Sequence, residues 1–340
     1  MLVRSVCLVL AIVFASVAAV AAPHHSTNAL APTADDQAVR ADIVKRVERL
    51  LKTEDFAALN KMAADFRTTR ARTPSGMWKL RVFHLSVRYY IAQNQPRGEC
   101  VSSAEPLLTR WLAVDPSAPA PIITRASDLL EQAWCKRDDP ASGFDAFLAD
   151  ASEADKWLVD HKVSASIDPE YYAIAEDVAF VTRHDKANFD GLLAEGISRE
   201  PGYYDLYISA MKYYLPSAFG SKDEVDRIAR LAMQKTASSD GAGAYARVYW
   251  AYVDCGCEIW QSSVDWPLMK RSMADVVASY PADYNIVNFA KISCQIGDGT
   301  EAAKYLRKLG NDNGLAWSGD EEREQCFTLA GLRSARTASR

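Results

Sequence analysis

Cysteine has the most reactive side chain in this 340-residue sequence, and it occurs seven times. Cys7 lies in an apolar N-terminal segment, and the other six are Cys100, Cys135, Cys255, Cys257, Cys294 and Cys326. An even number of cysteines in an exported chain is typical of disulfides, because an oxidising compartment does not keep thiols reduced. Cys100 and Cys135 flank a predicted helical hairpin, so we expect them to bond to each other.

The four cysteines of the last third leave their pairing open. Cys255 and Cys257 are separated by one residue and cannot easily bond to each other. We therefore expect each of them to bond to Cys294 or to Cys326, with no choice between the two pairings. A four-cysteine zinc site is the alternative, but such a site needs two close pairs, and Cys294 and Cys326 are far apart in the sequence.

The segment FRTTRARTPSGMWKLRVFHLSVR gathers guanidinium groups around one indole. Its candidate binding residues are Arg67, Arg70, Arg72, Trp78, Arg81 and Arg88. Arg81 and Arg88 are seven residues apart and share one face of the expected helix. We interpret the group as a docking patch for an acidic protein segment, a lipid head group or a cell-envelope polymer. A solvated basic face without a ligand is the alternative.

Patterns for catalysis, cofactors and metals are weak. GAGAYA at 241–246 fits G-x-G-x-x-A, but it follows a helical pattern instead of a strand, so we interpret it as a turn and expect no cofactor. His84, His161 and His184 are isolated on expected helices, which is typical of surface or satisfied core residues, and we expect no metal site. Glu195 is the nearest candidate for the acid of a glycan-cleaving enzyme, although the sequence context of such enzymes is missing.

The elements that must position these residues are helices. Apolar residues recur every three or four positions, as at Val39, Ile43 and Val47, and breaks such as Thr73–Gly76 interrupt the pattern. Alternating patterns are scarce. The sequence therefore predicts an all-α fold of about 14 helices without a sheet.

Similar joints between expected helices contain Pro116, Pro169, Pro201 and Pro281. Proline is tolerated in the first helical turn because its missing N–H has no partner there. Pro169 and Pro201 are 32 residues apart, and each has tyrosines at the second and third positions after it. A helix-pair repeat of about 32 to 40 residues indicates an irregular tetratricopeptide-like superhelix of helical hairpins. A globular helical domain without repeats is the alternative.

Five tyrosines crowd into REPGYYDLYISAMKYYLP, which is expected to be an interior helix. At 100° per residue, Tyr203, Tyr207 and Tyr214 point away from the polar stripe and are predicted to be core residues. Tyr213 borders that stripe and Tyr204 lies between the faces, so these two are our candidates for lining a groove.

Four segments resemble one family: FAALNKMAADFRTTRARTPSGMWKL, REPGYYDLYISAMKYYLPSAFG, YARVYW and YPADYNIVNFAKISC. They are similar to a bacterial family of tetratricopeptide-like α-helical proteins that is catalogued as a domain of unknown function. The resemblance covers most of Asp42–Gly310. It implies a helical repeat fold and supplies no catalytic residue.

The ends of the chain predict export. Residues 1–22 have one positive charge, an apolar run and a small-residue end, as in a signal peptide. An uncleaved membrane anchor is the alternative. We expect a flexible leader at 23–36, a helical repeat domain at 37–333 and a disordered tail at 334–340. The mature protein is expected in the bacterial periplasm or secreted, without an integral membrane segment.

The net charge of −5 is unevenly distributed: 40–97 holds 13 Lys and Arg against 5 Asp and Glu. An acidic chain without a long basic stripe is a poor candidate for binding nucleic acids. We expect an interaction scaffold for a protein partner, with an anionic envelope component as a further partner. A cell-envelope enzyme that cleaves glycans or peptides, and an inhibitor or immunity-type protein that occludes a partner, are the alternatives.

Overall fold

The computed structural model describes residues 35–96, 100, 102–138, 143–183, 185–309 and 317–332. The chain divides into two compact units. The N-terminal unit is Gln37–Glu224, and the C-terminal unit is Val225–Arg340 together with Met1–Asp36. The repeat domain expected at 37–333 is thus divided within one helix, α11 (Lys222–Asp240).

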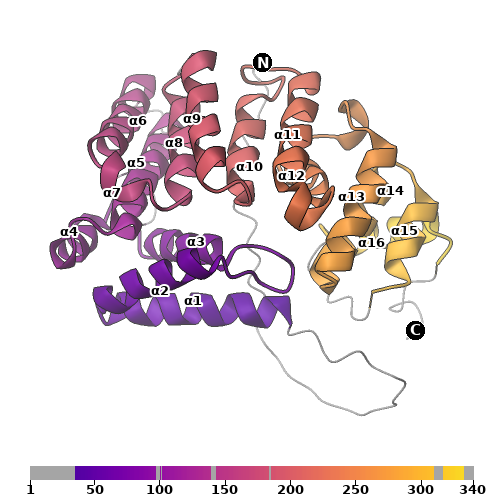
Figure 1. Cartoon of the computed structure of the whole chain (residues 1–340), viewed down its shortest axis with the longest axis horizontal. Helices are drawn as coiled ribbons and strands as arrows, with labels where there is room; N and C mark the ends of the chain where they lie inside the picture. The colour runs from indigo at the N-terminus through magenta and orange to yellow at the C-terminus, as the bar shows by residue number, and fades with distance from the viewer. Residues whose placement is uncertain are drawn as a thin grey trace, which may run out of the picture. The chain divides into compact units, whose positions relative to one another are not determined.

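Both units are helical, as labelled in Figure 1. Within the described residues there are 16 α-helices and no β-strand, which confirms the predicted all-α fold of about 14 helices. No helix in this part of the chain is both long enough and apolar enough to cross a membrane. The expected signal peptide and tail lie outside the described residues, as does the leader apart from Asp35 and Asp36.

The N-terminal unit contains α1 (Asp36–Lys52), α2 (Phe56–Thr69), α3 (Lys79–Gln93), α4 (Glu105–Val114), α5 (Pro119–Asp138), α6 (Gly143–Asp160), α7 (Lys162–Ala165), α8 (Glu170–Val181), α9 (Lys186–Arg199) and α10 (Tyr204–Tyr213). The expected apolar face of α1 is buried, with Ile43 and Val47 at most 2% exposed. α2 begins after Asp55, whose carboxylate accepts from the Ala58 N–H at 3.1 Å; Asp55 is its N-cap.

α8 is the central helix of the N-terminal unit. Ten of its twelve residues are buried, and it packs against α5, α6, α9 and α10. The end of α8 that carries Pro169 and Glu170 is therefore held from several sides. This end forms part of the site described below.

The tyrosines of α10 are more deeply buried than we expected. Tyr203, Tyr207 and Tyr214 are 0% exposed, which confirms them as core residues. Tyr204 and Tyr213 are only 7% and 2% exposed, so the expectation that they line a groove is wrong. Tyr213 stacks on a phenylalanine of α9, and the chain after α10 folds back over it. A helical projection considers the helix alone and misses such cover.

The C-terminal unit contains most of α11, then α12 (Gly243–Asp254), the short 3₁₀ helix η1 (Ile259–Gln261), α13 (Trp266–Ser279), α14 (Asp283–Gln295), α15 (Gly299–Leu306) and α16 (Asp320–Leu329). Its helices mostly pack on their neighbours in the chain, α12 on α13, α13 on α14, and α14 on α15. The segment GAGAYA forms the turn before α12 and the first residues of that helix, which agrees with our interpretation of it as a turn.

Two disulfides are present in the structure. Cys100 and Cys135 are bonded, with 5.4 Å between their Cα atoms, which confirms that pairing. Cys294 bonds to Cys326, again with 5.4 Å between the Cα atoms, because α16 packs on α14. The expectation that Cys255 and Cys257 bond to these two is therefore wrong: neither is part of a disulfide.

Candidate functional site

A pocket of about 360 Å³ lies in the N-terminal unit where α2 ends, α9 ends and the loop between α7 and α8 passes. We call it the arginine pocket, and define it by Arg67, Arg70, Ser166, Ile167, Arg199 and Glu200. Arg67 and Arg199 occupy the last turns of α2 and α9, where a cation interacts favourably with the helix dipole. Arg70 ends α2 in a left-handed conformation, with φ 49°.

Positive charge exceeds negative charge on the lining of this pocket. Glu200 accepts from Arg70 Nε at 2.7 Å. The Arg67 guanidinium is 3.7 Å from the carboxylate of buried Asp168, beyond hydrogen-bonding distance. Arg199 makes a long hydrogen bond of 3.4 Å to Glu195, and its guanidinium lies over the Tyr172 ring, 5.7 Å from the centroid. Each of the three arginines therefore has one carboxylate partner, close for Arg70 and looser for Arg67 and Arg199. Of these partners only Glu200 lines the pocket, so the lining itself is basic, and such a lining suits an anion.

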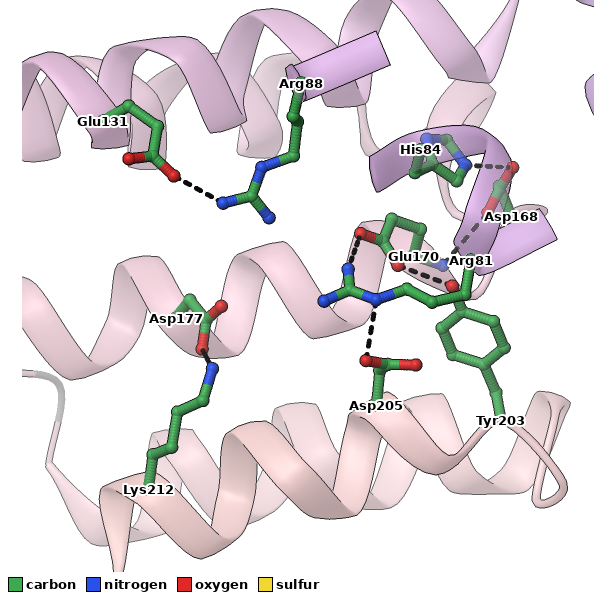
Figure 2. A network of polar contacts seen from close by, with 10 residues as sticks. All are labelled: Arg81, His84, Arg88, Glu131, Asp168, Glu170, Asp177, Tyr203, Asp205 and Lys212. Atoms are coloured by element: carbon green, nitrogen blue, oxygen red, sulfur yellow. Dashed lines mark hydrogen bonds and ion pairs between the residues drawn. The ribbon is translucent and has the colours of Figure 1, made fainter. Parts of the chain in front are cut away.

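The loop that lines the pocket is fixed from beneath by Asp168. This residue is 0% exposed, and its Oδ2 lies 3.2 Å from His84 Nε2 (Figure 2). The ring nitrogen that faces a carboxylate must carry the proton and donate it. Asp168 Oδ1 accepts from the backbone N–H of Glu170 at 3.0 Å, which shapes the first turn of α8. His84 is thus a satisfied core residue, as its isolation suggested.

Arg81 makes a second set of buried contacts beside that loop. Its Nη1 donates to Glu170 at 2.5 Å and its Nε to Asp205 at 2.8 Å, and Figure 2 shows the guanidinium between the two carboxylates. The other Glu170 oxygen accepts from the Tyr203 hydroxyl at 2.5 Å. Burial, followed by the Glu170 charge, raises the pKa of Tyr203 well above its ordinary value. The hydroxyl therefore stays protonated and remains a donor.

The docking patch expected from Arg81 and Arg88 is wrong. The Arg81 side chain is 15% exposed and its charge is matched by two acids. Arg88 contacts Glu131 of α5 at 2.5 Å, and its side chain is 27% exposed. Shared helical spacing placed the two on one face, but that face packs on other helices.

Arg72 and Trp78 hold a turn instead of presenting a surface. Both donate to the Gly202 carbonyl, Arg72 Nη2 at 3.2 Å and Trp78 Nε1 at 2.8 Å. The Arg72 guanidinium lies over the Tyr204 ring, 4.9 Å from its centroid. Trp78 is 3% exposed. These candidate binding residues therefore fasten the start of α10 to the loop before α3.

Of the predicted basic residues, only Arg67 and Arg70 line the pocket. Sequence reasoning missed Arg199 and the loop before α8. A signal was present in IDPEYY, where two acids flank Pro169. In the structure both acids are 0% exposed, and they contact His84 and Arg81, because a buried charge needs a partner.

Glu195 lies beside the pocket and is not arranged as a catalytic acid. Hydrogen bonds from Lys162 at 2.6 Å and from the Tyr172 hydroxyl at 2.8 Å reach its two oxygens. The Lys162 hydrogen bond lowers its pKa, whereas a glycosidase acid needs a raised one. In the described part of the chain, no group of three or more His, Cys, Asp or Glu could hold a metal ion.

Comparison with known proteins yields no relative: no family model, no curated protein and no solved structure matches the chain. The tetratricopeptide-like family resemblance stays a prediction. The function must therefore be argued from the arginine pocket itself.

Proposed function

We propose that this protein is an exported interaction scaffold that binds a protein partner in the cell envelope through an acidic group seated in the arginine pocket. The carrying observation is the convergence of Arg67, Arg70 and Arg199 from two helix ends on one small pocket. Guanidinium forks match carboxylates in charge and geometry, and often bind them through two parallel hydrogen bonds.

The buried contacts beneath the pocket support a binding role. Contacts of Asp168 with His84 and of Glu170 with Arg81 hold the lining loop and the start of α8, so this side of the pocket is fixed. The two disulfides support export, because such bonds persist in oxidising compartments. The enzyme alternative loses its candidate acid, because the ion pair with Lys162 favours the charged form of Glu195.

The test compares two charge-neutralising double variants of the full chain. Arg70 and Arg199 have side chains that are 64% and 50% exposed. Arg46 and Arg110 are matched controls in the same unit, 49% and 52% exposed. We expect Arg70→Gln/Arg199→Gln to reduce capture of a protein from a cell-envelope extract by about tenfold or more, and Arg46→Gln/Arg110→Gln to leave it unchanged.

Capture would be measured by crosslinking on immobilised protein, with circular dichroism to confirm that both variants are folded. Equal capture by the two variants would exclude the pocket as the binding site. Retention of a glycan or lipid in place of a protein would reject the protein-partner part of the proposal.

A further inference from the structure

Three large apolar side chains are exposed on the segment that leads along the chain to the arginine pocket. Val159 at the end of α6, Val163 in α7 and Ile167 in the following loop are 65%, 93% and 56% exposed. They recur at intervals of four residues, and Ile167 also lines the pocket. We call these three residues the apolar strip.

The fold does not require the apolar strip. On the same segments Leu158 is 2% exposed and Ala165 is 0% exposed, so other residues supply the core contacts. Single exposed apolar residues are ordinary on protein surfaces. Here three exposed apolar residues recur at regular spacing, and the last of them lies at a cluster of cations. This arrangement indicates a surface that binds apolar and anionic groups together.

Of the apolar strip, Ile167 is the residue that lines the pocket. α2 and α9, whose residues are all described, expose no large apolar side chain. Their ends contribute arginines instead. Ile167 is therefore the point at which the apolar strip and the arginine lining meet.

We propose that the arginine pocket takes the terminal carboxylate of a partner polypeptide, and that the apolar side chains preceding that carboxylate lie on Val159, Val163 and Ile167. This inference rests on the proposed function and names the part of the partner that is bound. Capture of a chain terminus by fixed polar groups is a recurrent mode of peptide recognition. The charge complementarity is that of one carboxylate with a lining of three arginines and one glutamate.

The experiment uses two synthetic octapeptide libraries with randomised last four positions, one with a carboxyl terminus as the free acid and one amidated. Each is passed over the immobilised full chain, and retained peptides are identified by mass spectrometry. We expect the free-acid library to be retained at least about tenfold better, with Leu, Ile, Val or Phe enriched in the last four positions. Equal retention of the amidated library would overturn the inference.

A second pair of variants separates the strip from the pocket. Val163→Asp/Ile167→Asp is expected to reduce retention of the free-acid peptides about tenfold, whereas Val114→Asp is the control at a comparably exposed site, 53% exposed, on α4. If the strip variant retains peptides as well as the control does, the inference fails. The proposed function still stands in that case, provided that partner capture depends on Arg70 and Arg199.

Self-association is measured in parallel by analytical ultracentrifugation. If the chain forms a dimer that Val163→Asp/Ile167→Asp dissociates, a second copy covers the strip and the inference is overturned. A monomer that retains free-acid peptides supports it.

Discussion

The two units differ in how far apart in the sequence their polar partners lie. In the N-terminal unit, Arg70 and Glu200 are 130 residues apart, and so are Arg72 and Gly202. In the C-terminal unit, the Tyr245 hydroxyl donates to Asp226 across 19 residues. Other polar contacts of that unit span about one helical hairpin, such as the 32 residues between Trp266 and Asp298.

Short separations are typical of stacked helices that touch only their neighbours. Long separations arise in the N-terminal unit because α2 and α3 lie against the region of α8 to α10. The arginine pocket forms at this closure. The comparison therefore teaches that the candidate site is built where the chain departs from neighbour-to-neighbour packing.

Among the substitutions that test this difference, Arg81→Met is expected to have the largest effect on stability. It leaves buried Glu170 and partly buried Asp205 without the cation between them, and we expect the unfolding free energy to fall by about 3–5 kcal/mol. The matched change in the C-terminal unit is Arg230→Met, whose side chain is 39% exposed between two aspartates. That substitution should lower the unfolding free energy by about 1 kcal/mol or less. Urea denaturation followed by circular dichroism measures both, and a smaller loss for Arg81→Met would contradict the comparison.

The disulfides should show no such difference between the units. Cys100–Cys135 and Cys294–Cys326 close loops of similar length, with separations of 35 and 32 residues. Cys100→Ser and Cys326→Ser should each lower the unfolding free energy by about 2–4 kcal/mol under oxidising conditions. Denaturation with and without reductant gives the measurement. Pairing at either site is refuted if reductant leaves the stability of the wild-type protein unchanged.

A smaller contrast is expected between two tyrosine hydroxyls. Tyr203→Phe removes the donor to one buried oxygen of Glu170 and should cost about 1–3 kcal/mol. Tyr249→Phe removes a 3.1 Å donor to Asp226, but Tyr245 still donates to the same oxygen at 2.6 Å. We expect this substitution to lower the unfolding free energy by about 0.5–1 kcal/mol. Equal losses in urea denaturation would mean that the buried carboxylate of Glu170 does not depend on a single hydroxyl.

Glu176 gives the most pH-dependent effect. It is 0% exposed in α8, and its carboxyl oxygens have no hydrogen-bond partner within the described residues. Burial, and then the neighbouring Asp177 charge, raise its pKa well above 4.5. The unfolded chain therefore loses this proton first as the pH rises, so the stability present below about pH 4.5 declines at higher pH.

Glu176→Leu should consequently raise the melting temperature more at pH 8 than at pH 4.5, with a gain of about 1–2 kcal/mol at the higher pH. Glu176→Gln removes the same titration with little change of shape. Thermal melts of both variants across this pH range provide the measurement. If both retain the wild-type slope of stability against pH, Glu176 is not the titrating group.

Local periodicity was sufficient to predict the helices and the core tyrosines. The apolar face of α1 and the burial of Tyr203, Tyr207 and Tyr214 follow from side-chain spacing alone. The Cys100–Cys135 bond was also predictable, because its partners flank one hairpin. The helices and the core tyrosines depend on residues that are close in the sequence, and the bond depends on a single hairpin with no rival cysteine nearby.

Features that depend on tertiary closure could not be predicted in this way. The roles of Arg81 and Arg199 follow from acids about 90 residues away or from a neighbouring loop, which no spacing rule encodes. The Cys294–Cys326 bond spans only 32 residues, but Cys255 and Cys257 were rival partners, and only the packing of α16 on α14 decides between them. The sequence indicated that the basic segment was unusual, but not which of its charges face solvent.

The anchoring of the Ser166–Pro169 loop by Asp168 has a consequence for association. The conformational entropy of this loop is lost when the protein folds, before any ligand binds. The lining loop is therefore preorganised, and the proposed binding of a chain terminus is expected to proceed without rearrangement of this loop, with a rate set by diffusion and electrostatic steering.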